Sequence, residues 1–244
     1  MRIKVLLESE NDLTFPKDYR RYFMSFLKKV FEKAGFLDKI FGEKKYRPYV
    51  FSVWFGENFK IDEKVRAGNK ISFFFSSGDP LVITNFYDGV LKLKDEKHKL
   101  IKECFEIKEI RLLSYKKITS NKATFKTMGI CVLNNPQGSK KDFRTWYVTP
   151  YDDLELFNEI LYQRTNDRFR YITGKNTTHS IRLNLIKDCQ LKEVIAKHYN
   201  GNVRGFSGTF ELEGSPEILQ FVYDYGLGVR TGQGFGLIEL VNGC

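Results

Sequence analysis

Residues 215–241, SPEILQFVYDYGLGVRTGQGFGLIELV, place a helix, a glycine-rich loop and a strand one after another. The first three residues, Ser-Pro-Glu, are an N-cap residue, a first-turn proline and a first-turn acid, and predict a helix over 215–225. Five glycines follow within the eleven residues of Gly226–Gly236, with Arg230 near their middle. Residues 235–241 then predict a strand. This half of the chain therefore closes with a helix, a long glycine loop and a strand.

Upstream of this stretch, strand and helix patterns follow one another in both halves of the chain in a similar order, which is less regular in the second half. In the first half we expect strands at 2–8, 49–55, 70–75 and 105–113, and helices at 16–34 and 79–91. In the second half we expect strands at 122–133, 180–186, 193–198 and 203–213, and a helix at 152–163. The order βαββαβ is the ferredoxin-like motif. The fold class is thus α+β, with tandem ferredoxin-like (RRM-like) domains over 1–116 and 117–244, joined near 114–120, and a C-terminal glycine-rich loop.

Composition narrows the classes of function. Forty Lys and Arg against thirty Asp and Glu give a net charge of +10 and a pI near 9.3, which favours a polyanionic partner such as nucleic acid. The four cysteines, at positions 104, 131, 189 and 244, form no Cys-x-x-Cys pair, so we expect no disulfide framework, metal site or cofactor. No apolar run approaches the ~18 residues of a membrane span, and we expect a cytoplasmic protein with no membrane partner.

The glycine loop does not match the common nucleotide-binding loops. Thr231 stands where a dinucleotide fingerprint needs glycine, and the Gly-Lys-Ser/Thr of a phosphate-binding loop is absent. Both of those loops also precede a helix, whereas this loop follows one. Two explanations stay open: a long helix–strand connection in which glycines supply positive φ, or a backbone that must approach RNA closely. We favour the second.

Three further segments, taken with the glycine loop, resemble a known family. The segments are Phe15–Arg21, leading into the first helix, Tyr49–Ser52, in the second strand, and Gly205–Glu211, before the last helix. The glycine loop itself has a Gly-hydrophobic-Gly pattern on either side of a basic spacer. Taken together, the loop and the three segments are similar to the CRISPR-associated precursor-RNA endoribonucleases of the repeat-associated (RAMP) superfamily. The resemblance spans nearly the whole chain.

The resemblance implies an activity and a partner. The partner is CRISPR repeat RNA in a long precursor, and other Cas proteins of an effector complex are further partners to expect. The implied reaction is one metal-independent cut per repeat, in which a ribose 2′-hydroxyl attacks the adjacent phosphate. The products are a 2′,3′-cyclic phosphate and a 5′-hydroxyl.

The chain departs from many relatives where they carry a general-base histidine. Counting back from Ser52 places that histidine near Phe41 and Gly42, and none is present. The three histidines, His98, His179 and His198, lie outside the matching segments, and we expect them at the surface. The region is instead cationic: between Lys17 and Arg47 there are ten Lys or Arg and four acids. Cations can hold a phosphate in line and stabilise the charge that develops on it.

The resemblance places the site on these cations and on the glycine loop. We expect a catalytic group of Lys28, Lys45, Arg47 and Tyr46. We expect RNA contacts from Lys17, Arg21, Lys44, Gly226, Gly228, Arg230, Gly232, Gln233, Gly234 and Gly236. Tyr46 and Tyr49 are alternatives for orienting the 2′-hydroxyl, and either could instead pack in the core.

Three functions fit these observations. The first is a catalytic repeat endoribonuclease, slower than relatives with a histidine base, which typically contributes about 10²–10⁴-fold. The second is a catalytically inactive repeat-RNA binder or a subunit of a CRISPR effector complex. The third is an unrelated RNA-recognition module, for which the Arg/Lys-Gly-Phe-Gly-Phe signature is absent. We favour the first.

Overall fold

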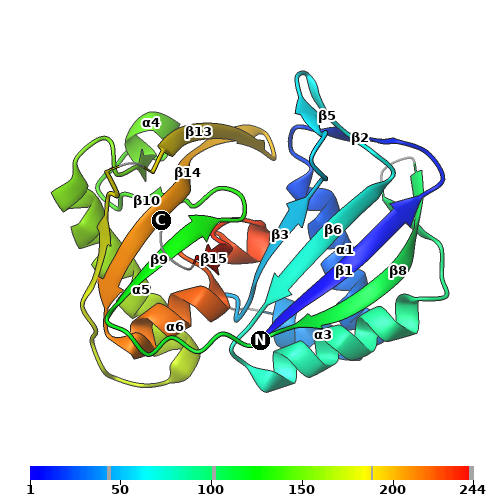
Figure 1. The fold of residues 1–244 in the computed structure, drawn as a ribbon, viewed down its shortest axis with the longest axis horizontal. Helices are drawn as coiled ribbons and strands as arrows, with labels where there is room; N and C mark the ends of the chain where they lie inside the picture. The colour runs from blue at the N-terminus through cyan, green and yellow to red at the C-terminus, as the bar shows by residue number, and fades with distance from the viewer. Residues whose placement is uncertain (43–44, 101–102, 188, 242–244) are drawn as a thin grey trace.

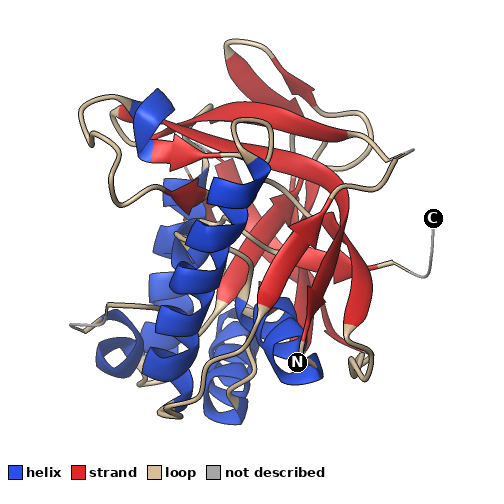
Figure 2. Ribbon diagram, turned by 90° about the vertical axis from the view of Figure 1, so that its left-hand side faces the viewer, coloured by secondary structure: helices blue, strands red, loops and turns tan. Residues whose placement is uncertain are grey.

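The computed structural model describes residues 1–42, 45–100, 103–187 and 189–241. Two halves, each a sheet with helices, lie side by side, and the glycine-rich segment runs between them (Figure 1). Seen after a quarter turn, most of the helices gather on one side of the strands (Figure 2). None of the helices in these ranges combines the length and the apolar character needed to cross a membrane.

The N-terminal half has the predicted βαββαβ order. Its principal elements are β1 (Arg2–Ser9), α1 (Arg20–Lys33), β3 (Val50–Trp54), β6 (Lys70–Ser76), α3 (Pro80–Leu93) and β8 (Glu103–Leu113). The sheet order is β3-β6-β1-β8-β7, with every pair antiparallel. Smaller elements that the sequence did not predict are β2 (Leu13–Pro16), α2 (Leu37–Phe41), β4 (Lys60–Ile61), β5 (Lys64–Ala67) and β7 (His98–Leu100).

Alternation along β1 determines which face of this sheet is buried. Ile3, Val5 and Leu7 are at most 1% exposed, and Val5 pairs with Phe73 of β6. A one-residue slip would turn all three side chains to the other face, so burial specifies the register. The helices cover this face: Phe86 of α3 stacks on Phe75 of β6 with 4.0 Å between ring centroids.

The C-terminal half has the same order with one additional strand between its two helices. Its principal elements are β9 (Lys122–Thr127), α5 (Leu154–Thr173), β12 (Ile181–Asn184), β13 (Leu191–His198), β14 (Gly201–Gly214), α6 (Pro216–Tyr225) and β15 (Ile238–Leu240). The sheet order is β12-β14-β9-β15, and β13 pairs with the first part of β14. Short additions are β10 (Leu133–Asn134), α4 (Phe143–Trp146), β11 (Tyr147–Val148) and the 3₁₀ turn η1 (Thr231–Gln233). The tandem ferredoxin-like α+β fold is confirmed.

Several element boundaries differ from the prediction. The first helix begins at Arg20 and not at residue 16, the last strand is limited to Ile238–Leu240, and two differences are larger. The strand expected to reach residue 133 ends at Thr127, and α5 continues ten residues beyond Gln163 to Thr173. The polar run at 164–168 hid the end of α5, because several of its polar side chains are buried and hydrogen-bonded. Asn166, for example, is 2% exposed and donates to the carbonyl of His179 at 2.9 Å.

Each half has its own hydrophobic core, with buried side chains from 3–107 in one cluster and from 118–238 in the other. Residues 114–121, between β8 and β9, hold no helix or strand. The division into domains 1–116 and 117–244 stays a prediction. What the fold shows directly is that the glycine-rich segment packs against both halves, and the candidate site lies where it does so.

Candidate functional site

A cleft of about 590 Å³ receives side chains from both halves of the chain. Its walls come from α1, the segment between α2 and β3, α5, and the glycine-rich loop. The cleft is lined by Met24, Lys28, Phe41, Lys45, Tyr46, Arg47, Tyr49, Asn134, Trp146, Arg164, Arg168, Val229, Arg230, Thr231, Gly232 and Gln233. Residues expected in the active site and residues expected in the glycine loop thus meet in one place.

The charge of the cleft is entirely positive among its described lining residues. The cations are Lys28, Lys45, Arg47, Arg164, Arg168 and Arg230, and none of the described lining residues is Asp or Glu. Uncompensated cations in a concave site focus the field and attract a polyanion. The cleft can therefore accommodate phosphate groups.

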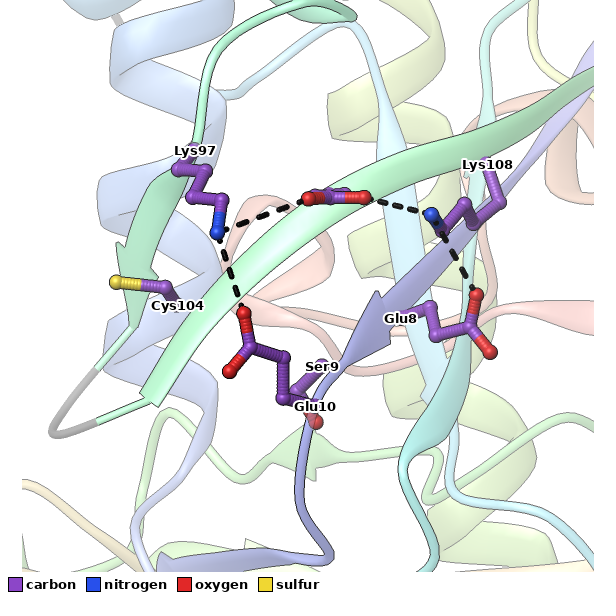
Figure 3. Close-up of a pocket in the computed structure, with 7 residues that line it drawn as sticks. Glu8, Ser9, Glu10, Lys97, Cys104 and Lys108 are labelled. Carbon is purple, nitrogen blue, oxygen red and sulfur yellow. Dashed lines mark hydrogen bonds and ion pairs between the residues drawn. The ribbon is translucent and has the colours of Figure 1, made fainter.

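A hollow on the outer side of the N-terminal sheet has the opposite character (Figure 3). There Lys97 lies between Glu10 and Glu106, at 3.2 and 4.0 Å, and Lys108 lies between Glu106 and Glu8, at 2.6 and 3.8 Å. Three carboxylates and two lysines line this hollow, which leaves one negative charge in excess. It offers a phosphate no net attraction.

Lys28 and Lys45 present exposed ammonium groups to the cleft. Lys28 projects from α1 with its Nζ 5.7 Å from the centre of the Phe41 ring, and the Nζ of Lys45 lies 5.3 Å from the centre of the Tyr46 ring. Aromatic faces orient the two cations, and neither cation is recorded in an ion pair within the described part of the chain. Both ammonium groups can contact a ligand.

Arg47 is partly committed to the protein itself. Its Nη1 donates to the carbonyls of Ile40 at 2.6 Å and of Gly42 at 3.0 Å, which closes the C-terminal end of α2. A cation at a helix C-terminus satisfies carbonyls that have no partner within the helix. Arg47 therefore holds the segment that carries Lys45, and any contact with a ligand comes in addition to that role.

The two tyrosine alternatives now differ. Tyr49 is fully buried and packs against Phe75, with 5.3 Å between ring centroids, so it belongs to the core. Burial raises the pKa of its hydroxyl well above the usual range, so this hydroxyl stays protonated. Tyr46 is half-buried at the cleft and meets Tyr171 of α5 edge to face at 5.3 Å. Lys45 strengthens this contact, since its backbone N–H donates to the Tyr171 hydroxyl at 3.1 Å.

Unpaired polar atoms also concentrate at the cleft. In the described ranges four buried side-chain atoms have no hydrogen-bond partner, and two of them, the Tyr49 hydroxyl and Arg164 Nε, belong to lining residues. Buried polar groups are nearly always paired, so such atoms call for an explanation. Both atoms belong to residues in the wall of the cleft and are themselves out of contact with solvent.

The glycines of the loop face the protein. Gly226, Gly228, Gly234 and Gly236 all have φ between 78° and 90°. A Cβ at Gly228 would lie 2.2 Å from the carbonyl oxygen of Val132, and one at Gly232 would lie 2.6 Å from Cγ of Arg47. This finding corrects our preference between the two explanations: positive φ and intramolecular packing account for these glycines. Contact of the glycines with RNA stays a prediction.

Two buried arginines hold the loop from opposite sides. Arg168 of α5 donates from Nη1 to the carbonyls of Gly226 and Gly228, each at 2.8 Å, and Arg20 of α1 donates from Nε to that of Gly234 at 3.1 Å. Burial lowers the pKa of Arg168 to about 10, so it remains charged at neutral pH. These bonds go to carbonyls, and the positive charges are therefore not neutralised.

The surface of the loop is formed by Arg230 and Gln233. The Nη1 of Arg230 donates to Oε1 of Gln233 at 2.9 Å, and the same oxygen lies 3.0 Å from Nε2 of His198. The expectation of surface histidines was wrong for His198 and His98, which are 4% and 3% exposed. Each of these two rings packs against a phenylalanine and also has a hydrogen-bond partner, which compensates for burying its polar atoms.

The other predicted residues that the structure describes do not line the cleft. Lys17 is exposed and does not line it, and Arg21 lies with Lys28 in an adjoining hollow of about 480 Å³. Lys44 lies outside the described residues. Gly226, Gly228, Gly234 and Gly236 are buried and do not line the cleft. Arg21 is also paired with Asp18 at 3.0 Å.

Sequence reasoning missed Arg164, Arg168 and Trp146. The two arginines were missed because α5 was predicted to end at Gln163. Their four-residue spacing places both on one face of a helix, and this would have pointed to them had the helix been extended. Trp146 comes from α4, which no periodic pattern indicated.

Comparison with known proteins decides the family. The family model described as CRISPR associated protein Cas6, C-terminal, matches residues 113–240, which is more than half of the chain. The chain belongs to the Cas6 family. Over 172 residues it is 27% identical to the CRISPR-associated endoribonuclease-like protein Cas6 of Pyrococcus furiosus, an alignment that covers 70% of this chain and 68% of that relative.

Solved Cas6-related structures have the same fold over the full length. A Cas6-related protein from Pyrococcus furiosus is 25% identical with a TM-score of 0.81, and the alignment covers 99% of this chain and 98% of that one. A RAMP protein described as binding different RNA substrates has the same TM-score at 23% identity, covering 99% and 100% of the two chains. The predicted membership in a CRISPR-associated protein family is confirmed.

Proposed function

We propose that this Cas6 chain binds CRISPR repeat RNA in the cationic cleft and cuts it there. The observation that carries the proposal is the meeting of Lys28, Lys45, Arg47 and Arg230 in one cleft without a described acid. Membership in a family whose Pyrococcus furiosus relative is named an endoribonuclease-like protein supports the same function. Aromatic side chains beside the cations, Tyr46 and Trp146, suit stacking of unpaired bases.

The proposed reaction is metal-independent transfer of the phosphate within the RNA. The 2′-oxygen of one ribose attacks the adjacent phosphorus, the bond to the 5′-oxygen breaks, and a 2′,3′-cyclic phosphate and a 5′-hydroxyl result. The proton lost from the 2′-hydroxyl balances the proton gained by the 5′-oxygen. Lys28 and Lys45 would hold the phosphate in line and stabilise the negative charge on its oxygens as the transition state forms.

A second candidate function is a catalytically inactive binder of repeat RNA, alone or as a subunit of a CRISPR effector complex. The observation that favours it is that no histidine stands among the described lining residues of the cleft. His198 lies behind Gln233, and its burial lowers its pKa to about 4, which makes it a poor proton acceptor at neutral pH. Without a base, cleavage depends on cations alone.

Incubating the purified protein with cognate repeat RNA in EDTA separates the two functions. We expect a single cut with a cyclic phosphate on the 5′ fragment, detected by its mobility before and after acid opening of the cyclic ester. The control is the same RNA with a 2′-deoxy sugar at the cut site, which should bind and stay whole. Binding of the unmodified RNA without a cut would establish the inactive binder instead.

A further inference from the structure

His198 occupies an unusual position at the tip of the β13–β14 hairpin. This hairpin arches from the C-terminal half toward the other half (Figure 1). The His198 ring is 4% exposed and meets the rings of Tyr199 and Phe235 at 4.6 and 5.2 Å. It therefore sits against the glycine-rich loop, directly behind the surface that Gln233 offers to the cleft.

Hydrogen bonding determines how Gln233 is oriented. Arg230 can only donate, so the Gln233 atom that faces it at 2.9 Å must be the carbonyl oxygen Oε1. The same oxygen lies 3.0 Å from Nε2 of His198, which must therefore carry a proton and donate as well. One oxygen thus accepts from both sides. The two N–H donors of the Gln233 amide are the part left for a ligand.

The surroundings of His198 keep its ring neutral. Burial lowers its pKa to about 4, and the nearby charges of Arg230 and Arg20 act in the same direction, against the hydrogen bond to Gln233 and the charge of Asp18. The other ring nitrogen, Nδ1, is buried without a partner. A neutral ring whose only hydrogen bond goes to Gln233 fits a role in orienting that side chain and does not fit proton transfer.

We propose that His198 is a positioning residue, which holds Gln233 and through it Arg230 in the arrangement that binds repeat RNA. The inference rests on the proposed function of the cleft. Without the His198 bond, the Gln233 amide is free to rotate, and the Arg230 guanidinium loses the fixed acceptor that directs it. The loss of this arrangement should lower the affinity for RNA, because Arg230 and Gln233 are proposed to contact the RNA and hold it in place.

The test compares RNA binding of His198→Phe and Arg230→Ala over a range of salt concentrations. Arg230→Ala should weaken binding across RNA sequences and lower the salt slope by about 0.7 on single strands. His198→Phe keeps an aromatic ring in the packed position and deletes the donor, and should weaken binding by about three- to ten-fold, the value of one hydrogen bond. The double variant should bind RNA only slightly more weakly than Arg230→Ala alone, because both substitutions remove the same contact.

Further variants separate positioning from packing. His198→Gln can donate to Gln233 in the same direction and should recover most of the lost affinity. Melting temperatures are measured alongside, and if His198→Phe does not fold, His198→Met, an unbranched side chain, replaces it in the comparison. Two outcomes would overturn the role of His198 and leave the proposed cleft intact. One is an additive loss of affinity in the double variant. The other is that folded His198→Phe binds RNA like the wild type while Arg230→Ala binds more weakly. Wild-type binding by Arg230→Ala would overturn the proposed cleft as well.

Discussion

Lys28 and Lys45 come from different elements, yet both present exposed ammonium groups to one cleft. A lysine ammonium can act on a phosphate as a fixed positive charge, without giving up or taking up a proton. Position decides what they can do. Lys28 is fixed by the rigid α1, and Lys45 by the contact of its backbone with Tyr171.

Lys28→Ala and Lys45→Ala should each slow single-turnover cleavage by about ten-fold or more, which corresponds to ~1.4 kcal/mol of transition-state stabilisation, with a smaller change in RNA affinity. Cleavage should persist in EDTA and show no inflection between about pH 5.5 and 7.5, where a free histidine titrates. The matched control is Lys92→Ala, which removes an exposed lysine on α3 that pairs with Asp88 at 2.7 Å. Equal slowing by all three lysine variants would argue against a role for this cleft.

His198 should also affect stability in acid. An unfolded histidine titrates near pH 6.5, whereas burial lowers the folded pKa of His198 to about 4. As the pH falls from 6.5 to 4, this histidine becomes protonated in the unfolded chain and stays neutral in the folded protein. The unfolded state is therefore favoured, and the free energy of unfolding decreases as the pH falls. Urea unfolding of the wild type should therefore lose more stability from pH 6.5 to 4 than that of His198→Phe. Parallel curves for the two proteins would contradict the buried neutral ring.

At the scale of elements, the glycine-rich loop is packed between β3 of the N-terminal half and the segment that follows β9. Leu227 and Gly236 are linked by a backbone hydrogen bond of 2.8 Å, and Val229 donates to Val132 at 2.8 Å, so the loop folds back on itself and on the segment after β9. The η1 turn interrupts it and brings Gln233 and Arg230 to the surface. Glycine is required wherever the returning backbone leaves no space for a side chain.

Gly228→Ala should destabilise the protein more than Gly174→Ala. Both residues have positive φ, 78° and 71°, which costs an L-residue about 1–2 kcal/mol. A Cβ at Gly174 meets nothing within 4 Å, whereas a Cβ at Gly228 meets a carbonyl oxygen at 2.2 Å, and this crowding should add about 1–3 kcal/mol. Denaturant unfolding measures the difference. If the two variants are equally stable, the loop moves freely enough to absorb a side chain.

At the scale of the whole molecule, the same loop joins the two halves. Gly226 packs on Val50, and Gly234 packs on Phe51, both of which belong to β3 of the other half. Arg2 of β1 adds a further link, since it is 5% exposed and its Nη1 lies 2.7 Å from Glu239 of β15. Contacts of this kind couple the stability of one half to that of the other.

The full chain should therefore unfold in a single calorimetric transition, and the isolated segment 117–244 should melt at a lower temperature than the full chain. The physical reason is that the loop loses Val50, Phe51 and Arg20 as packing partners when the first half is removed. The segment 1–116 is the companion measurement, because it keeps its own core and loses its contacts with the loop, with Glu239 and with Tyr171. Two separate transitions in the full chain would show that the halves fold independently.

Local sequence patterns were enough to predict the tandem fold and the family. They did not predict the features that depend on contacts between distant segments. Ile3, Val5 and Leu7 alternate along one strand, and α1 has one apolar face. Each of these patterns lies within a single element, so hydrophobic periodicity alone is enough to predict the element. The end of α5 and the burial of His198 were not predictable, because Arg168, Asn166 and His198 find their partners in segments far along the chain.

The sequence by itself determined the order of strands and helices, the excess of positive charge and the presence of Lys28, Lys45, Arg47 and Arg230, since these depend on local periodicity and composition. Only the tertiary structure decided that these cations meet in one cleft, that Arg164 and Arg168 join them, and that the glycines face inward. The reason is physical. A cleft between the two halves of the chain is built from long-range contacts, and a buried polar group is stable only beside a partner that the local sequence does not identify.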